Sequence, residues 1–120
     1  MAPEVILNKS ISRAADYYSV GILTYEMTLG EAANPLRGKG KKEILAFLNT
    51  GAIQVKKSEL PENYSFKLAD FIDRLLQRDP ENRLGYENYY QIQTHKWIKN
   101  FSWDRIQNKV MEAPFIPQVQ

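Results

Sequence analysis

The sequence predicts a mainly α-helical domain followed by an extended C-terminal tail. Residues Asp16–Gly30 are apolar nearly all round a helical wheel, which is typical of a helix packed on most sides. Residues Phe66–Gln77, capped by Ser65, form the clearest amphipathic helix. Its apolar side chains recur at helical spacing: Leu68, Phe71, Ile72, Leu75 and Leu76. The alternating segment Ala52–Leu60 is short and mixed, so it indicates extended chain more than a strand.

The first part of the chain contains the signals of a short helix and of the ends of the central helix. Pro3 suits the first turn of a helix, and Glu4 is favourable at the same end of the helix dipole. Asp16 is able to cap the start of the central helix, and Gly30 stands where a left-handed C-cap is expected.

Two more helices are expected before the tail. Lys41–Asn49 is opened by the basic loop Arg37–Lys42, which lacks the spacing of a phosphate-binding loop and is interpreted as solvated. Tyr89–Lys99 is predicted to be helical, with His95 packed or exposed instead of binding a ligand. The inward side chains of that helix are expected to be Ile92, Trp97 and Ile98. No helical period continues after about Asn108, and two prolines make the tail extended.

Composition excludes several kinds of protein. The 120 residues are 43% hydrophobic and 25% charged, as in ordinary globular domains, and the net charge of +2 is too small to indicate nucleic acid or a membrane as a partner. There is no cysteine, hence no disulfide or thiolate metal site, and one histidine cannot form a multi-histidine metal site. The apolar runs are far too short to span a membrane. We therefore expect a cytoplasmic protein.

Three motifs occur in an order that suggests a family. Ala-Pro-Glu stands at residues 2–4, Asp-x-x-Ser-x-Gly-x-x-x-Tyr-Glu-Met at 16–27, and Arg-Asp-Pro-Glu-Asn-Arg-Leu-Gly at 78–85. Together they resemble the C-terminal part of the large lobe of eukaryotic protein kinases, where the first motif closes the activation segment. The resemblance runs from Met1 to about Pro117 and implies the helical fold of that lobe.

The end of the chain is similar to the AGC group of serine/threonine kinases. It carries His-Lys-Trp at residues 95–97, Trp103, and the segment Lys109–Pro117. The resemblance divides the chain into a partial kinase domain, residues 1–100, and the start of an AGC-like tail, residues 101–120. Two departures stand out. Tyr17 and Tyr18 replace a usual pair of tryptophans, and Ala-Asn-Pro-Leu at residues 33–36 replaces the usual Pro-Pro-Phe.

The resemblance also implies roles for five residues. Glu4 is expected to form a buried ion pair with Arg83, and Asp16 to hold the backbone of the catalytic loop. Ala2 would lie at the edge of the loop that receives the residue after the phosphoacceptor. Glu26 would contact an arginine of a basic substrate, since a carboxylate binds a guanidinium strongly. Asp16 as a mere helix cap and Glu26 as a buried structural acid remain alternatives.

The motifs that carry out phosphoryl transfer are missing from the sequence. It contains no Gly-x-Gly-x-x-Gly, no His-Arg-Asp and no Asp-Phe-Gly. We therefore assign no catalytic, cofactor-binding or metal-binding residue, and we expect the chain to be inactive on its own. ATP and Mg²⁺ are expected for a full-length kinase. Family members often carry methionine just before Ala-Pro-Glu, so Met1 is expected to be an internal methionine of a longer chain.

Three hypotheses about function follow. The first is part of a serine/threonine kinase domain that supplies scaffold and substrate-docking surface to the full-length enzyme. The second is a non-catalytic kinase-lobe remnant that binds a protein partner, and the third is an unrelated helical adaptor with chance motifs. The expected partners are a protein substrate or the missing kinase half. Because the central helix lacks some of its packing partners, we also expect marginal stability and self-association through an exposed apolar patch.

Overall fold

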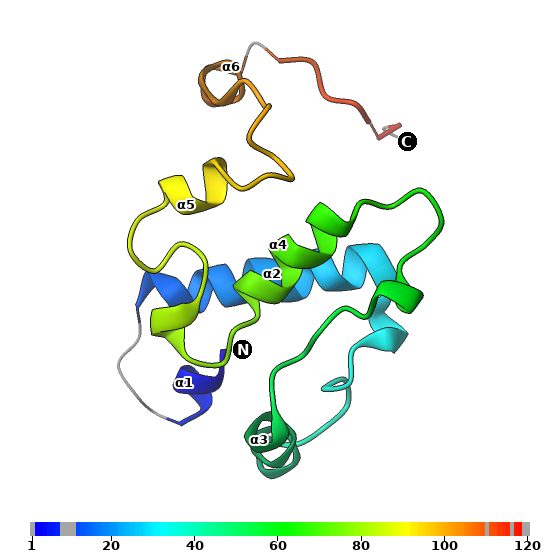
Figure 1. Cartoon of the computed structure of the whole chain (residues 1–120), viewed down its shortest axis with the longest axis vertical. Helices are drawn as coiled ribbons and strands as arrows, with labels where there is room; N and C mark the ends of the chain where they lie inside the picture. Colours follow the sequence, from blue (N-terminus) through cyan, green and yellow to red (C-terminus); the bar gives the residue numbers. More distant parts are fainter. Residues whose placement is uncertain (1, 8–11, 110, 116, 119–120) are drawn as a thin grey trace.

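A computed structural model describes residues 2–7, 12–109, 111–115 and 117–118 (Figure 1). Met1 lies outside the described residues. In the described part the only regular elements are helices, joined by turns and irregular chain, and there is no β-strand, which confirms the predicted helical fold class. Its elements are α1 (Pro3–Ile6), α2 (Arg13–Leu29), η1 (Glu31–Ala33), α3 (Lys41–Thr50), η2 (Lys57–Glu59), α4 (Phe66–Leu75), η3 (Pro80–Asn82), α5 (Tyr90–Gln93) and α6 (Trp103–Gln107), where η marks a 3-10 helix.

The core lies where α2 and α4 pack side by side (Figure 1). The apolar face predicted for α4 is buried, and Ile72, Leu75 and Leu76 have no exposed surface. Gly21 of α2 allows the close approach: a Cβ there would lie 2.8 Å from Cδ2 of Leu76 and 2.9 Å from Cβ of Leu75. The central contact of the fold therefore depends on one residue without a side chain.

The helix ends show which cap predictions were right. Oγ of Ser12 accepts a hydrogen bond from the Ala14 amide at 3.3 Å, and α2 begins at Arg13. The prediction that Asp16 caps α2 is therefore wrong, because Ser12 supplies a suitable oxygen one turn earlier. Gly30 ends α2 at the predicted place with a positive φ of 89°, which glycine adopts readily, but its ψ of 154° lies outside the left-handed helical region that was predicted. The cap predicted at Ser65 is confirmed by a 3.1 Å bond from the Lys67 amide.

The predicted helix Tyr89–Lys99 is wrong, because only Tyr90–Gln93 is α-helical. After it the backbone continues in turns. Nδ1 of His95 accepts the Trp97 amide at 3.1 Å, so the side chain takes a donor that a regular helix would use. Trp97 was expected inward, yet it stays 38% exposed, with its ring 5.1 Å from that of Phe71.

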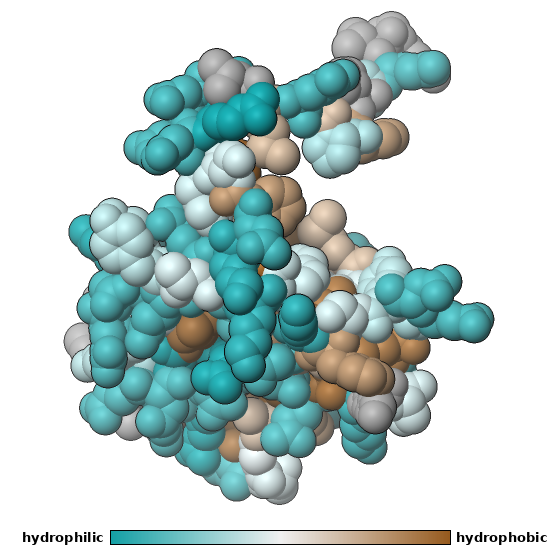
Figure 2. Space-filling view, turned by 45° about the horizontal axis from the view of Figure 1, so that its top comes forward, coloured by the Kyte–Doolittle hydropathy of each residue, from teal (hydrophilic) through white to brown (hydrophobic). Residues whose placement is uncertain are grey.

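The C-terminal part stands apart from the helical body. Figures 1 and 2 show α6 and the following chain above the α2–α4 layer, joined to it by a narrow neck. A side-chain bond joins α6 to the end of α5: Nε1 of Trp103 donates to the Gln93 carbonyl at 3.1 Å. No helix follows Gln107 in the described tail, in line with the sequence, and the domain boundary at residue 100 stays a prediction.

In the part of the chain that the structure describes, no helix combines the length and the apolar character needed to cross a membrane.

Replacing Gly21 with alanine tests the close contact of α2 with α4. Alanine is the better helix former, but its Cβ would overlap Leu75 and Leu76. We expect a loss of about 1–3 kcal/mol in the free energy of unfolding. Urea denaturation followed by circular dichroism measures it. Gly40→Ala is the matched control, because a Cβ there meets no atom within 4 Å. Equal stability of the two variants would contradict the tight contact.

Candidate functional site

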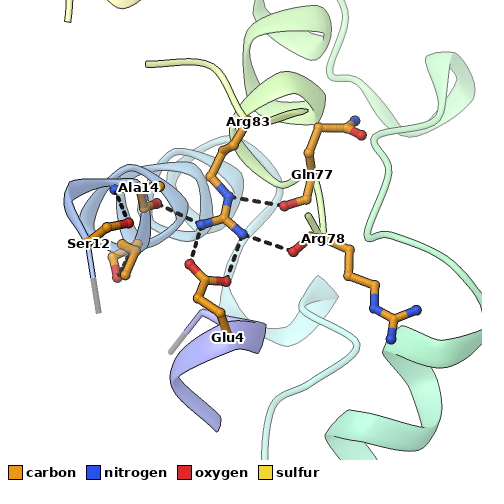
Figure 3. Close-up of polar contacts among 8 residues, drawn as sticks. Glu4, Ser12, Ala14, Gln77, Arg78 and Arg83 are labelled. Atoms are coloured by element: carbon orange, nitrogen blue, oxygen red, sulfur yellow. Dashed lines mark hydrogen bonds and ion pairs between the residues drawn. The ribbon is translucent and has the colours of Figure 1, made fainter. Parts of the chain in front are cut away.

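The most completely bonded side chain in the described structure is the buried guanidinium of Arg83, just after η3. Its Nη1 donates to Oε1 of Glu4 at 2.6 Å, and its Nη2 donates to Oε2 of Glu4 at 3.0 Å (Figure 3). The exposed fractions of the two side chains are 0% and 5%. The geometry is the bidentate arrangement in which a guanidinium binds a carboxylate most strongly.

The other N–H groups of Arg83 bind backbone carbonyls. Nη1 also donates to Ala14 at 2.8 Å, Nη2 to Arg78 at 3.1 Å, and Nε to Gln77 at 3.0 Å (Figure 3). All five N–H donors of the guanidinium are therefore used. They join α1, the first turn of α2 and the segment after α4. Sequence reasoning missed these three acceptors, because a backbone carbonyl leaves no signal in the residue types.

The Tyr18 ring lies against the same guanidinium, with 4.9 Å between Cζ of Arg83 and the ring centroid. Tyr18 is fully buried, and its hydroxyl has no hydrogen-bond partner in the described part of the chain. Burial raises the pKa of Tyr18 to about 12, although the charge of Arg83 acts in the opposite direction. The phenol is therefore neutral at physiological pH and acts through packing and a cation–π contact.

The Glu4 carboxylate is ionised because Arg83 outweighs the effect of burial. Burial acts to raise the pKa of Glu4, but the hydrogen bonds and charge from Arg83 lower it below its ordinary value of 4.5. Pro3 at the start of α1 fixes the local backbone and places Glu4 in the first turn. Glu4 and Arg83, 79 residues apart in the sequence, are the two predicted site residues that the structure brings together.

Ala2 lies in the core instead of on the surface. Its exposed fraction is 1%, and its carbonyl accepts hydrogen bonds from the amides of Val5 and Ile6. Its side chain packs in the cluster that also contains Tyr18 and Ile72.

Asp16 is exposed on the first turn of α2, and its carboxylate has no hydrogen-bond partner among the described residues. It begins a stripe that continues at i+4, i+7 and i+11 with Val20, Leu23 and Met27, which are 42%, 58% and 78% exposed. These four residues form the open face of α2. The sequence alone indicates that these four residues share one side of α2, because the spacings i, i+4, i+7 and i+11 fall on one face of a helix.

Glu26 lies outside the open face and is half-buried. Its Oε1 accepts a hydrogen bond from Nδ2 of Asn34 at 3.0 Å, while Oδ1 of Asn34 accepts the Leu36 amide at 2.9 Å. The carboxylate is thus held in place with its second oxygen unbonded in the described structure. Asp16 and Glu26 lie ten residues apart on α2, about 15 Å along the axis, so they do not form a single site.

A metal site is absent from the described residues, which contain no group of three or more side chains suited to hold an ion.

Known proteins resemble the chain along almost its whole length. The family model described as the protein kinase domain matches residues 1–98. A protein kinase C-like protein of Cochliobolus heterostrophus is 35% identical over 99% of the chain and 10% of its own length. A probable serine/threonine-protein kinase of Dictyostelium discoideum is 32% identical, over the whole chain and 25% of its own length. The eye isozyme of protein kinase C from Drosophila melanogaster is 35% identical, over the whole chain and 16% of its length. The chain thus spans a quarter or less of each of these relatives.

Replacing Glu4 with glutamine tests the buried ion pair. The variant leaves the Arg83 charge uncompensated, so we expect unfolding to cost about 3–5 kcal/mol less at pH 7. Because the pKa of Glu4 is lowered on folding, its stabilisation is full above pH 4.5 and is lost as the pH falls further. The difference from the parent should therefore shrink on acidification. Urea titrations at several pH values measure it.

Glu81→Gln is the control for this experiment, because Glu81 is exposed on the neighbouring 3-10 turn. It should change stability by less than about 0.5 kcal/mol. A Glu4→Gln variant as stable as this control at pH 7 would overturn the structural importance of the pair.

Proposed function

The chain belongs to the protein kinase domain family, and from this premise we propose that it supplies the scaffold and a substrate-docking surface of a serine/threonine kinase. The relatives of the chain include protein kinase C and cGMP-dependent protein kinase, in agreement with an AGC-like kinase domain. Phosphoryl transfer itself, with ATP and Mg²⁺, belongs in this proposal to the complete enzyme. The observation that carries the scaffold role is the open face of α2.

The open face has the chemistry of a surface that another protein segment covers. Three large apolar side chains on the central helix are left in water, although the opposite side of the same helix is fully packed. Burying apolar area yields about 25 cal/mol per Å², so covering this stripe would add several kcal/mol. At its N-terminal end the free carboxylate of Asp16 is able to accept backbone N–H groups. A catalytic loop docked here would be positioned by the apolar stripe and by the Asp16 carboxylate.

Glu26 supports the docking role through its free oxygen. The Asn34 amide holds the carboxylate at Oε1, which leaves Oε2 to accept a guanidinium or ammonium group. Since one oxygen is already engaged, a substrate arginine would bind mainly through the other. We therefore propose a preference for basic substrates that is real but weaker than a fully bidentate pair would give.

A second function is favoured by the same open face. A kinase-lobe remnant without catalytic activity would use these apolar side chains to bind a protein partner or a second copy of the chain. Exposed apolar stripes of this kind are typical of interaction surfaces. In either case we propose a cytoplasmic location, by analogy with the kinases that the chain resembles.

Grafting the chain into a relative tests the scaffold role. The chain would replace the matching segment of the Drosophila eye isozyme of protein kinase C, and phosphoryl transfer to a basic peptide would be measured. We expect the chimera to be active. Asp16→Asn in the chimera should lower kcat, because an amide oxygen accepts N–H groups more weakly than a carboxylate.

Asp104→Asn is the matched control, because Asp104 is an exposed acid on α6, and it should leave activity unchanged. The 120-residue chain should bind no ATP with Mg²⁺ by calorimetry. A well-folded but inactive chimera, or an active one indifferent to Asp16→Asn, would count against the proposal, as would magnesium-dependent ATP binding by the chain.

A double substitution on the open face, Leu23→Lys with Met27→Lys, separates self-association from folding. Both side chains point into solvent, so we expect the free energy of unfolding to change by less than about 1 kcal/mol. The parent chain should self-associate in sedimentation velocity, and the variant should be monomeric. Ile106→Lys with Phe115→Lys, which alters exposed apolar residues elsewhere, should behave like the parent. Unchanged association of the open-face variant would exclude this surface.

A further inference from the structure

An open cavity of about 520 Å³ lies on the side of α4 that faces the α5 segment, and none of its lining residues belongs to the Glu4–Arg83 pair or to the open face of α2. We call it the α4–α5 groove. The lining residues that matter here are Phe66, Lys67, Asp70, Arg74, Leu84 and Lys96. The groove thus combines three cationic side chains and one carboxylate with apolar surface.

The single carboxylate in the groove is already engaged. Oδ2 of Asp70 accepts Nε of Arg74 at 2.9 Å and lies 2.8 Å from Nε2 of His95. Burial acts to raise the pKa of Asp70, but the His95 hydrogen bond and the Arg74 charge lower it overall, so Asp70 stays ionised. Asp70 and Arg74 neutralise one another.

Two positive charges remain without a partner. The ammonium groups of Lys67 and Lys96 are exposed and make no hydrogen bond or ion pair in the described part of the chain. Among the described residues, no other carboxylate lines the groove. Glu81 and Glu87 line a neighbouring cavity of about 230 Å³ that shares Arg74, Leu84 and Gln91 with it, and Asp73 on α4 accepts the Val55 amide. The α4–α5 groove therefore has a net positive charge of two beside an apolar floor.

His95 holds the groove in shape. The Trp97 amide donates to Nδ1 of His95, so the ring proton resides on Nε2 and donates to Asp70. The ring packs edge-on against Phe71, with centroids 5.1 Å apart. The imidazole is buried and neutral in this arrangement. His95 therefore joins the α4 side of the groove to the α5 side before any ligand binds.

We propose that the α4–α5 groove binds an acidic peptide segment of a partner protein, in which carboxylates flank a bulky apolar side chain. The carboxylates would pair with Lys67 and Lys96, and the apolar side chain would lie against Leu84 and Phe66, the latter 58% exposed. Complementary charges steer such a segment to the groove and fix its direction. The proposal goes beyond phosphoryl transfer and does not depend on the open face of α2.

A labelled peptide tests the proposal directly. The probe is a fluorescein-labelled Glu-Glu-Leu-Glu-Glu peptide, and its Kd for the 120-residue chain is measured by fluorescence anisotropy at low salt. The comparison peptide has glutamine in place of each glutamate. We expect saturable binding of the acidic peptide alone, weakening as salt screens the charges.

Charge reversal locates the site. Lys67→Glu with Lys96→Glu should weaken binding by about tenfold or more, since two attractions become two repulsions. Lys41→Glu with Lys42→Glu makes the same change in net charge on the distant helix α3 and should leave the Kd within about twofold of the parent. Circular dichroism of all variants confirms that the fold is kept, as expected for exposed lysines.

Three results would overturn the proposal. They are failure of the parent chain to bind the acidic peptide, equal binding of the glutamine peptide, and equal weakening by both pairs of substitutions. Binding to vesicles of phosphatidylserine that is lost with Lys67→Glu and Lys96→Glu, while the peptide does not bind, would assign the groove to a membrane surface instead.

Discussion

The guanidinium of Arg83 is the point at which separate parts of this small fold are held together. A buried cation is costly unless each of its donors is satisfied, and here all five find acceptors. Only one of the four acceptor groups, the Glu4 carboxylate, carries a charge, and the other three are backbone carbonyls, of Ala14 in the first turn of α2 and of Gln77 and Arg78 after the end of α4. The same side chain is therefore neutralised by Glu4 and joined by hydrogen bonds to the start of α2 and to the segment after α4.

Helix α2 has one side that packs against α4 and one side that is exposed to solvent. Toward α4 the absence of a side chain at Gly21 brings the helices into close contact. On the opposite side the stripe that begins at Asp16 is left to solvent. A helix of 17 residues with one packed side and one bare apolar side is stable here only because α4 and Arg83 fix it. The packed side of α2 thus forms within the described chain, while the open face stays in solvent.

The sequence predicted different parts of the structure for different physical reasons. The buried face of α4 follows from periodicity, because each turn repeats the same environment. The pairing of Glu4 with Arg83 came from family motifs, since no periodicity connects residues this far apart. Periodicity predicted a helix that continues after Gln93, and this was wrong, because the His95 ring accepts a backbone N–H that a helix would use. Asp16 was mistaken for a cap because Ser12 also satisfied the rule and lay closer to the true start.

The carboxylates of the chain divide into two classes by how their oxygens are used. Both oxygens of Glu4 bind one guanidinium, and one oxygen of Asp70 binds both Arg74 and His95, so these acids are paired with charged or ring N–H donors of the fold itself. Asp16 has no partner in the described structure, and Glu26 has one oxygen engaged. An exposed carboxylate costs little while water solvates it, and it gains energy when a donor replaces that water in a drier setting. The acids that the fold leaves open are therefore the ones available to a second protein segment, while the closed pairs keep the helices that present them in place.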